Sequence, residues 1–268
     1  MRRLLPFLFA ATPWFTVLPQ ANPGHWTVDH PLDGFTTDEL GNLYTLSGND
    51  IDLYSRDGTH LAHNSFNSFG PISRMDAFSS LKPLIFSSAQ GQLALLDNTL
   101  SIQGAPIYLS RSGFPQVTLA CMGVMGRMWF FDDRDLALLR VDDQLQPVAN
   151  TGRLDQVLSF TPQPTYMEEA DGRLYLVDPA HGVLVFDLFG TFVRTLPIIG
   201  VQRVQVRDGF LWFVQDGALH RYNLRAFTQE PVPWPGGKPS LQVLDARIEH
   251  GRLYRLLPDR LEVEPLGP

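Results

Sequence analysis

The chain has 268 residues, of which 44% are hydrophobic, 11% aromatic and 18% charged. This composition is typical of a folded globular protein and excludes large-scale disorder, which goes with few apolar and many charged residues. The formal net charge is -7, and the scattered Lys and Arg residues form no basic stripe, which argues against nucleic acid as a partner.

The N-terminus has the pattern of a secretory signal. A basic pair, Arg2 and Arg3, precedes a largely apolar run, and the small residue Ala21 follows it. This order predicts a signal peptide over residues 1–21 and export to the periplasm or the extracellular medium. The alternative is an N-terminal membrane anchor, but Pro6 and Pro13 would disturb a helix that is already short for a bilayer. No later segment is apolar enough for a spanning helix, so no membrane span is predicted after cleavage.

A short apolar strand signal recurs along the rest of the chain at a spacing of about 42 residues. Its six copies are Gly41–Tyr44, Pro83–Phe86, Gly126–Trp129, Gly172–Tyr175, Gly209–Trp212 and Gly251–Tyr254. A fixed period of this length built from strands is typical of a β-propeller. We therefore predict that residues 22–268 form one all-β domain, a six-bladed β-propeller.

The repeat unit is clearest in the fifth copy. Its four expected strands are Val201–Val206, Phe210–Val214, Ala218–Asn223 and Val232–Trp234. Asp-Gly pairs separate the first three strands, as hairpin turns with positive φ prefer. The unit is therefore predicted to be a four-stranded antiparallel blade, whose continuously apolar second strand is covered on both faces by neighbouring blades.

The sixth copy lacks a strand. Three strands are expected, within 241–248, 253–257 and 261–264, before the chain stops. At the other end, Trp26–Asp29 precedes the first copy and belongs to no blade. A ring that completes its last blade with a strand from the opposite terminus leaves no long unpaired edge. We expect Trp26–Asp29 to pair with Leu261–Glu264.

The repeats carry a family resemblance. The phrase Asp38-x-x-Gly41-Asn42-Leu43-Tyr44, followed by Arg56-Asp57-Gly58, resembles the repeat of NHL-type propellers and, more loosely, of the gluconolactonase class. The stretch Asp76–Leu100 resembles a group of exported propellers from Bacteroidota. These motifs are turns and strands, so the resemblance implies an architecture and carries no activity.

The gluconolactonase resemblance implies a divalent cation held by oxygen ligands at the mouth of the central channel. Five carboxylates lie on or beside first strands and are candidate ligands: Asp76, Glu168, Glu169, Asp245 and Glu249. Exposed or arginine-paired carboxylates are the more common outcome for such residues. His60 and His63 are expected on opposite faces of one strand, which is wrong for a shared metal. No catalytic or cofactor-binding motif is present, so no cofactor, metal or catalytic residue is predicted.

An aromatic residue ends each copy of the strand signal. The six are Tyr44, Phe86, Trp129, Tyr175, Trp212 and Tyr254. Recurrence at one position of every repeat indicates packing between blades rather than a binding platform. The single cysteine, Cys121, excludes an intrachain disulfide and is expected to be a buried, inert thiol in a first strand.

Two functions follow as hypotheses. The first is a noncatalytic exported scaffold or protein-binding module, in which a protein partner contacts a propeller face or channel mouth, within a cell-envelope assembly. Four residues on or beside the innermost strands are candidates for that contact: Arg74, Lys82, Tyr166 and Arg203. The alternative is a metal-dependent lactonase or esterase, which requires three or more carboxylate or amide oxygens converging at one mouth.

Overall fold

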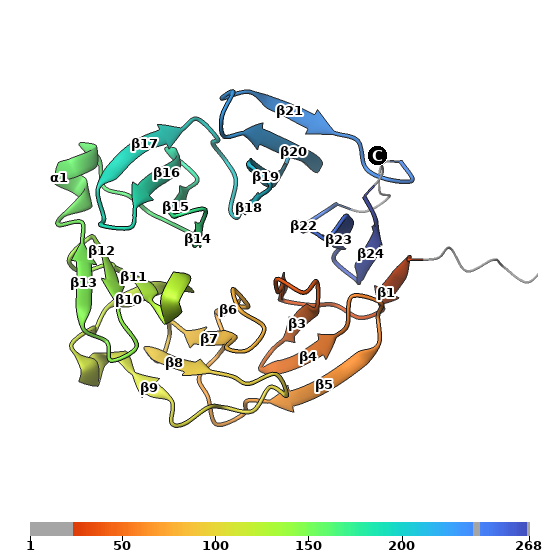
Figure 1. Ribbon diagram of the computed structural model, residues 1–268, viewed down its shortest axis with the longest axis horizontal. Coiled ribbons are helices and arrows are strands. Elements are labelled where there is room, and N and C mark those ends of the chain that lie inside the picture. Colours follow the sequence, from red (N-terminus) through yellow and green to blue (C-terminus); the bar gives the residue numbers. More distant parts are fainter. Residues whose placement is uncertain (1–23, 238–241, 267–268) are drawn as a thin grey trace, which may run out of the picture.

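The computed structural model describes residues 24–237 and 242–266, which form a ring of six four-stranded antiparallel sheets around a central channel (Figure 1). The predicted signal peptide, residues 1–21, lies outside the described residues. The six-bladed propeller predicted from the repeats is therefore confirmed. No helix in the described ranges is long and apolar enough to cross a membrane.

Each blade begins at the channel and adds its strands outward. The innermost strands, for blades 1 to 6, are β2 (Gly34–Thr37), β6 (Arg74–Asp76), β10 (Val117–Met122), β14 (Tyr166–Ala170), β18 (Gln205–Arg207) and β22 (Asp245–Glu249). The second strands are β3 (Leu43–Ser47), β7 (Leu84–Ser87), β11 (Met128–Asp132), β15 (Arg173–Asp178), β19 (Phe210–Gln215) and β23 (Arg252–Leu256).

The third strands are β4 (Asp50–Tyr54), β8 (Gln92–Leu95), β12 (Ala137–Val141), β16 (Gly182–Asp187), β20 (Ala218–Asn223) and β24 (Leu261–Pro265). The outermost strands are β5 (His60–Ser65), β9 (Ile107–Tyr108), β13 (Pro147–Asn150), β17 (Phe192–Leu196), β21 (Gln229–Val232) and, in blade 6, β1 (Trp26–Val28). Within the described ranges, helix is limited to the short η1 (Leu109–Ser112), η2 (Val124–Gly126) and α1 (Leu154–Leu158).

The ring closes as expected. Strand β1 pairs antiparallel with β24, with Trp26 opposite Val263 and Val28 opposite Leu261. The hydroxyl of Tyr254 in blade 6 also donates a hydrogen bond to the carbonyl oxygen of Gly41 in blade 1, at 2.8 Å. The two ends of the described chain therefore complete one blade, and that blade is joined to the first.

The hydrophobic core is divided among the blade interfaces. Six clusters of buried side chains each join two neighbouring blades. The second strands supply much of this core: every residue of β7 and β11 is buried. The six recurring aromatic residues are all buried, as expected for packing between blades. Cys121 is also buried, and this burial raises the pKa of its thiol well above the ordinary value.

Two strands in the fifth copy have other bounds than predicted. The innermost strand β18 begins only at Gln205, and Val201 and Val204 are buried in the blade interface outside the sheet. The outermost strand β21 is Gln229–Val232, so it ends at the residue where the predicted strand, Val232–Trp234, begins. Trp234 lies outside the strand. Its ring is buried, and its Nε1 donates a hydrogen bond to the carbonyl oxygen of Gly217 at 3.2 Å.

Candidate functional site: the two mouths of the channel

The channel contains a cavity of about 400 Å³ at each mouth. One cavity lies where the six innermost strands end, and we call it the carboxyl mouth. The other lies where these strands begin, and we call it the amino mouth. All six blades contribute to the carboxyl mouth, so the ring itself builds the site. Arg74 and Tyr166 line both cavities and therefore lie between them.

Three of the four binding candidates meet between the two cavities. The guanidinium carbon of Arg74 lies 4.0 Å from the centroid of the Tyr166 ring, and that of Arg203 lies 5.2 Å from it. Arg74 Nη2 donates to the carbonyl oxygen of Met167 at 2.7 Å. Arg203 Nη1 lies 2.7 Å from Asp245 Oδ2. Cations within 6 Å of an aromatic face are attracted to it, so these contacts hold both arginines on the Tyr166 ring.

The Tyr166 hydroxyl joins a buried polar network. It donates to Glu168 Oε2 at 2.8 Å and accepts a hydrogen bond from Arg247 Nη1 at 3.2 Å. The other Glu168 oxygen accepts the Val206 amide of the next blade. Burial raises the pKa of the Glu168 carboxyl although Arg247 and the Val206 amide favour its ionised form. The network ties blades 4, 5 and 6 together at the channel.

Lys82 does not take part in this group. It lies exposed in the loop between β6 and β7 and lines neither cavity. The innermost strand of its blade ends at Asp76, six positions earlier in the chain. Its position beside an innermost strand in the sequence therefore does not bring it to the channel.

The candidate metal ligands are each engaged elsewhere. Glu169 is fully buried, pairs with Arg140 Nη2 at 3.0 Å and accepts hydrogen bonds from Trp129 Nε1 and the Val124 amide. Asp76 accepts the amides of Met122 and Phe78, each at 3.0 Å. The remaining three, Glu168, Asp245 and Glu249, face arginines: Arg247, Arg203 and Arg207 respectively. Within the described ranges no three His, Cys, Asp or Glu side chains form a group that could hold a metal ion.

The prediction that His60 and His63 lie on opposite faces of their strand is wrong. Their Nε2 and Nδ1 atoms lie 2.7 and 3.0 Å from the same atom, Asp52 Oδ1. The register between β4 and β5 shifts at Leu53/Tyr54, leaving Leu61 without an opposite residue. One extra residue in an edge strand reverses the alternation beyond it, so both imidazoles reach the same side.

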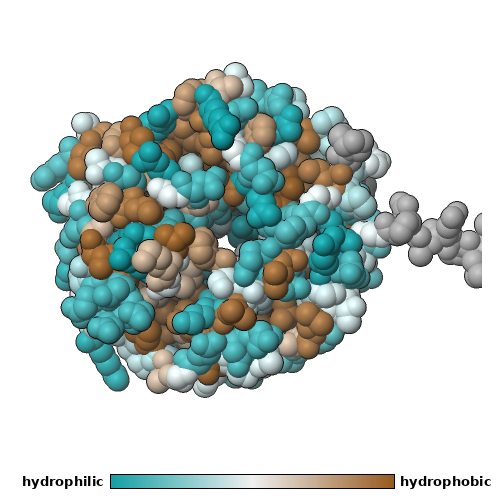
Figure 2. All heavy atoms as spheres, in the orientation of Figure 1, coloured by the Kyte–Doolittle hydropathy of each residue, from teal (hydrophilic) through white to brown (hydrophobic). Residues whose placement is uncertain are grey.

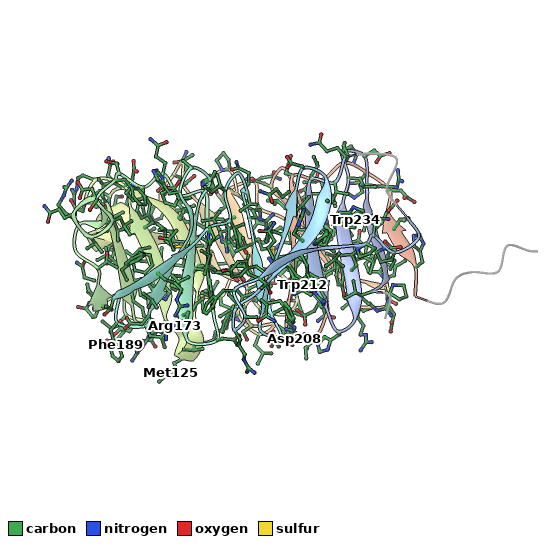
Figure 3. All side chains as sticks on the ribbon, turned by 90° about the horizontal axis from the view of Figure 1, so that it is seen from above. Met125, Arg173, Phe189, Asp208, Trp212 and Trp234 are labelled. Carbon is green, nitrogen blue, oxygen red and sulfur yellow. The ribbon has the colours of Figure 1, made fainter. Side chains whose placement is uncertain are left out.

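The rim of the carboxyl mouth carries exposed apolar side chains on three adjacent hairpins. Met125, at the tip of the blade 3 hairpin, is 83% exposed, and Leu40 in blade 1 is 58% exposed. The others are Phe78, Leu81 and Val124. Figure 2 views this face, with brown and tan atoms left of and below the channel opening, over blades 2 and 3. In Figure 3, Met125, Phe189 and Asp208 lie along one edge of the ring.

The cavity behind this rim is acidic. Its lining contains three arginines, Arg74, Arg207 and Arg247. Against them stand eight carboxylates, Asp38, Glu39, Asp76, Glu168, Glu169, Asp171, Asp208 and Glu249. The amino mouth has the opposite bias, with Arg74 and Arg203 against Asp33. The two ends of the channel therefore differ in the charge that they attract.

Sequence reasoning missed Arg247, Arg207 and Gln205 at the channel. A signal for them exists in the alternation of the innermost strands. Polar residues recur at every second position in Arg203-x-Gln205-x-Arg207 and Asp245-x-Arg247-x-Glu249. Alternate residues of a strand lie on one face, so each row reaches the same side of its blade.

These features define the chain as a six-bladed β-propeller with a polar channel, and its similarity to known proteins lies at the level of fold. No protein family matches the sequence. No curated protein matches it either. Among solved structures, one similar fold is that of virginiamycin B lyase from Staphylococcus aureus, solved as a catalytically inactive variant with quinupristin. The TM-score is 0.60 at 12% sequence identity, and the match covers 92% of this chain and 82% of that chain.

Two further neighbours come from other settings. BamB from Moraxella catarrhalis has a TM-score of 0.50 at 10% identity, covering 86% of this chain and 83% of that chain. PorZ from Porphyromonas gingivalis, a surface component of the type-IX secretion system, has a TM-score of 0.51 at 12% identity, covering 89% of this chain but only 34% of that one. At such identities the likeness shows the fold alone.

Proposed function

We propose that this protein is an exported, noncatalytic binding module whose carboxyl-mouth face docks a protein partner. One observation carries the proposal: the exposed apolar side chains on three adjacent hairpins gather at one mouth of the channel. Met125, Leu81 and Leu40 are the most exposed of these apolar side chains. Exposed apolar groups that cluster beside a polar cavity are typical of protein interaction sites.

The charge of the cavity behind the rim indicates the chemistry of the partner. A lining with more carboxylates than arginines attracts a cation, and a lysine or arginine side chain is the cation that a protein offers. The partner is therefore expected to present apolar side chains to the rim and a basic side chain to the opening. Met125 and Asp208 lie on the same edge of the ring, so one partner can contact both (Figure 3).

The envelope setting of the proposal rests on the signal-like N-terminus. PorZ, about a third of which matches this fold, is a surface component of the type-IX secretion system, so the architecture occurs in at least one bacterial surface protein. The metal-dependent hydrolase is the less supported alternative. It requires converging oxygen ligands, whereas the candidate carboxylates in the described part are paired with arginines or backbone amides.

The test is quantitative capture of partners from the native cells with tagged full-length protein. Met125→Glu places a charge on the rim and is expected to reduce capture of a specific partner at least about tenfold. The matched control is Ile199→Glu, because Ile199 is also exposed but lies between β17 and β18, on the opposite face. Equal capture by wild type and Met125→Glu would overturn the proposal. Localisation is tested on the same cells: export predicts a mature chain that begins at Asn22, in the periplasmic or extracellular fraction.

A further inference from the structure

The amino mouth has a construction that the docking function does not use. It lies at the opposite end of the channel from the apolar rim, and its lining combines two arginines with apolar walls. The only carboxylate in that lining, Asp33, is exposed and accepts the Gly48 amide at 2.6 Å. The inner end of this cavity therefore presents two guanidinium groups, and Arg203 is paired with Asp245.

Of the two arginines that line the amino mouth, Arg74 has the weaker carboxylate partner. Arg203 has Asp245 at 2.7 Å, but the nearest carboxylate oxygen to Arg74 lies 3.7 Å away, on Asp76. That carboxylate already accepts two backbone amides. The Arg74 Nε is buried and has no hydrogen-bond partner among the described residues. A buried guanidinium donor without an acceptor is costly, and an anion is the group that satisfies it best.

The walls above the arginines limit the kind of anion. Phe35, Leu46, Met75 and Leu119 line the cavity and would contact an apolar body. A volume of about 400 Å³ is at the small end of ligand sites, which suits a compact molecule. A carboxylate matches the planar fork of a guanidinium group.

We propose that the amino mouth binds a small organic monocarboxylate, with its carboxylate on Arg74 and Arg203 and its apolar body against the walls. The Tyr166 ring holds both guanidinium groups in place, so the site exists before the ligand arrives. The acidic carboxyl mouth repels the same anion, which gives the channel one entrance for it. This ligand site is independent of the proposed protein partner, because the two use opposite mouths.

The first experiment needs no variant. Benzoate and its uncharged isostere benzamide are titrated into the full chain at low salt by calorimetry. Benzoate is expected to bind with a dissociation constant of about 1 mM or tighter, and benzamide at least about tenfold more weakly. Equal affinities, or no heat from benzoate at about ten times that concentration, would overturn the proposal.

Variants then locate the site. Arg203→Gln removes one guanidinium and Leu119→Trp fills the wall while keeping both charges; each is expected to weaken benzoate binding at least about tenfold. Lys82→Gln removes a positive charge outside both cavities and is expected to bind benzoate as wild type does. If Arg203→Gln fails to fold, Leu119→Trp still decides the location. Benzoate binding that survives Leu119→Trp unchanged contradicts the proposed cavity.

Discussion

Tyr166 donates its hydroxyl hydrogen to Glu168, two residues along the same innermost strand, at 2.8 Å. The hydroxyl oxygen in turn accepts a hydrogen bond from Arg247 of blade 6. Three polar side chains from two blades are therefore joined by hydrogen bonds at the channel. Around the same ring lie Arg74 and Arg203, so one residue organises both the network and the two guanidinium groups at the inner end of the amino mouth.

Tyr166→Phe removes this hydroxyl and keeps the ring. Glu168 then loses a donor and Arg247 an acceptor, and the expected loss in the free energy of unfolding is about 1–3 kcal/mol. The measurement is urea unfolding at neutral pH. Tyr108→Phe is the matched control, because Tyr108 is exposed in an outermost strand, and a change within about 0.5 kcal/mol is expected. A Tyr166→Phe protein as stable as wild type would show that the network contributes nothing to stability.

Glu168→Gln tests the electrostatics of the same network through pH. Burial raises the pKa of Glu168 above its ordinary value of 4.5, so the folded state binds its proton more tightly than the unfolded state. Stability from this group is complete below that ordinary value and is lost as pH rises through the folded pKa. As pH rises from 4.5 to the folded pKa of Glu168, the wild-type protein should therefore lose stability relative to Glu168→Gln. The loss is at most about 1.4 kcal/mol per pH unit. A stability difference that is constant, or grows in favour of wild type as pH rises, would contradict the raised pKa.

Arg140→Met tests the buried ion pair between blades 3 and 4. Glu169, which is fully buried, would lose its guanidinium partner, and an uncompensated buried charge is expected to cost about 3–5 kcal/mol in the free energy of unfolding. Arg134→Met is the control, because the ion pair between Arg134 and Asp135 is exposed. Its loss is expected to change the free energy of unfolding by about 0–1 kcal/mol. Denaturant unfolding of both variants makes the comparison, and equal losses would argue against the burial of the pair.

Val28→Ala tests the closure of the ring. Val28 is buried against the blade 6 and blade 1 core, and removing two carbons there is expected to lower the free energy of unfolding by about 2 kcal/mol. The same change at Val148, in the exposed outermost strand of blade 3, is expected to alter it by less than about 0.5 kcal/mol. If urea unfolding showed that Val28→Ala lowers the free energy of unfolding no more than Val148→Ala does, the packing of β1 in the last blade would not contribute to stability.

The repeats predicted the fold well because they record packing. Tyr254 and its equivalents recur because every blade interface needs a large buried ring. The sixth copy lacked a fourth strand, and this absence pointed to Trp26–Asp29, of which Trp26–Val28 forms β1, because an unpaired edge is costly. The histidine prediction failed because a single bulged residue, Leu61, has no signature in a strand whose pairing is unknown.

The channel was predicted in part. Arg74, Tyr166 and Arg203 come from blades 2, 4 and 5, more than a hundred residues apart at the extremes, and only closure of the ring brings them together. Their distances to one another follow from the number of blades and the tilt of the strands rather than from local sequence. The rim around Met125 was not predicted either, because exposed apolar residues in turns carry no pattern by themselves.

The central claim is that a protein partner docks on the carboxyl-mouth face. Its most direct test is site-specific photo-crosslinking in native cells, with a benzophenone amino acid at position 125 in one protein and at position 199 in another. Both sites are exposed and apolar, and they lie on opposite faces. The account predicts a discrete crosslinked protein from position 125, dependent on light, and none from position 199. The same crosslinks from both positions, or a product from position 199 alone, would contradict it.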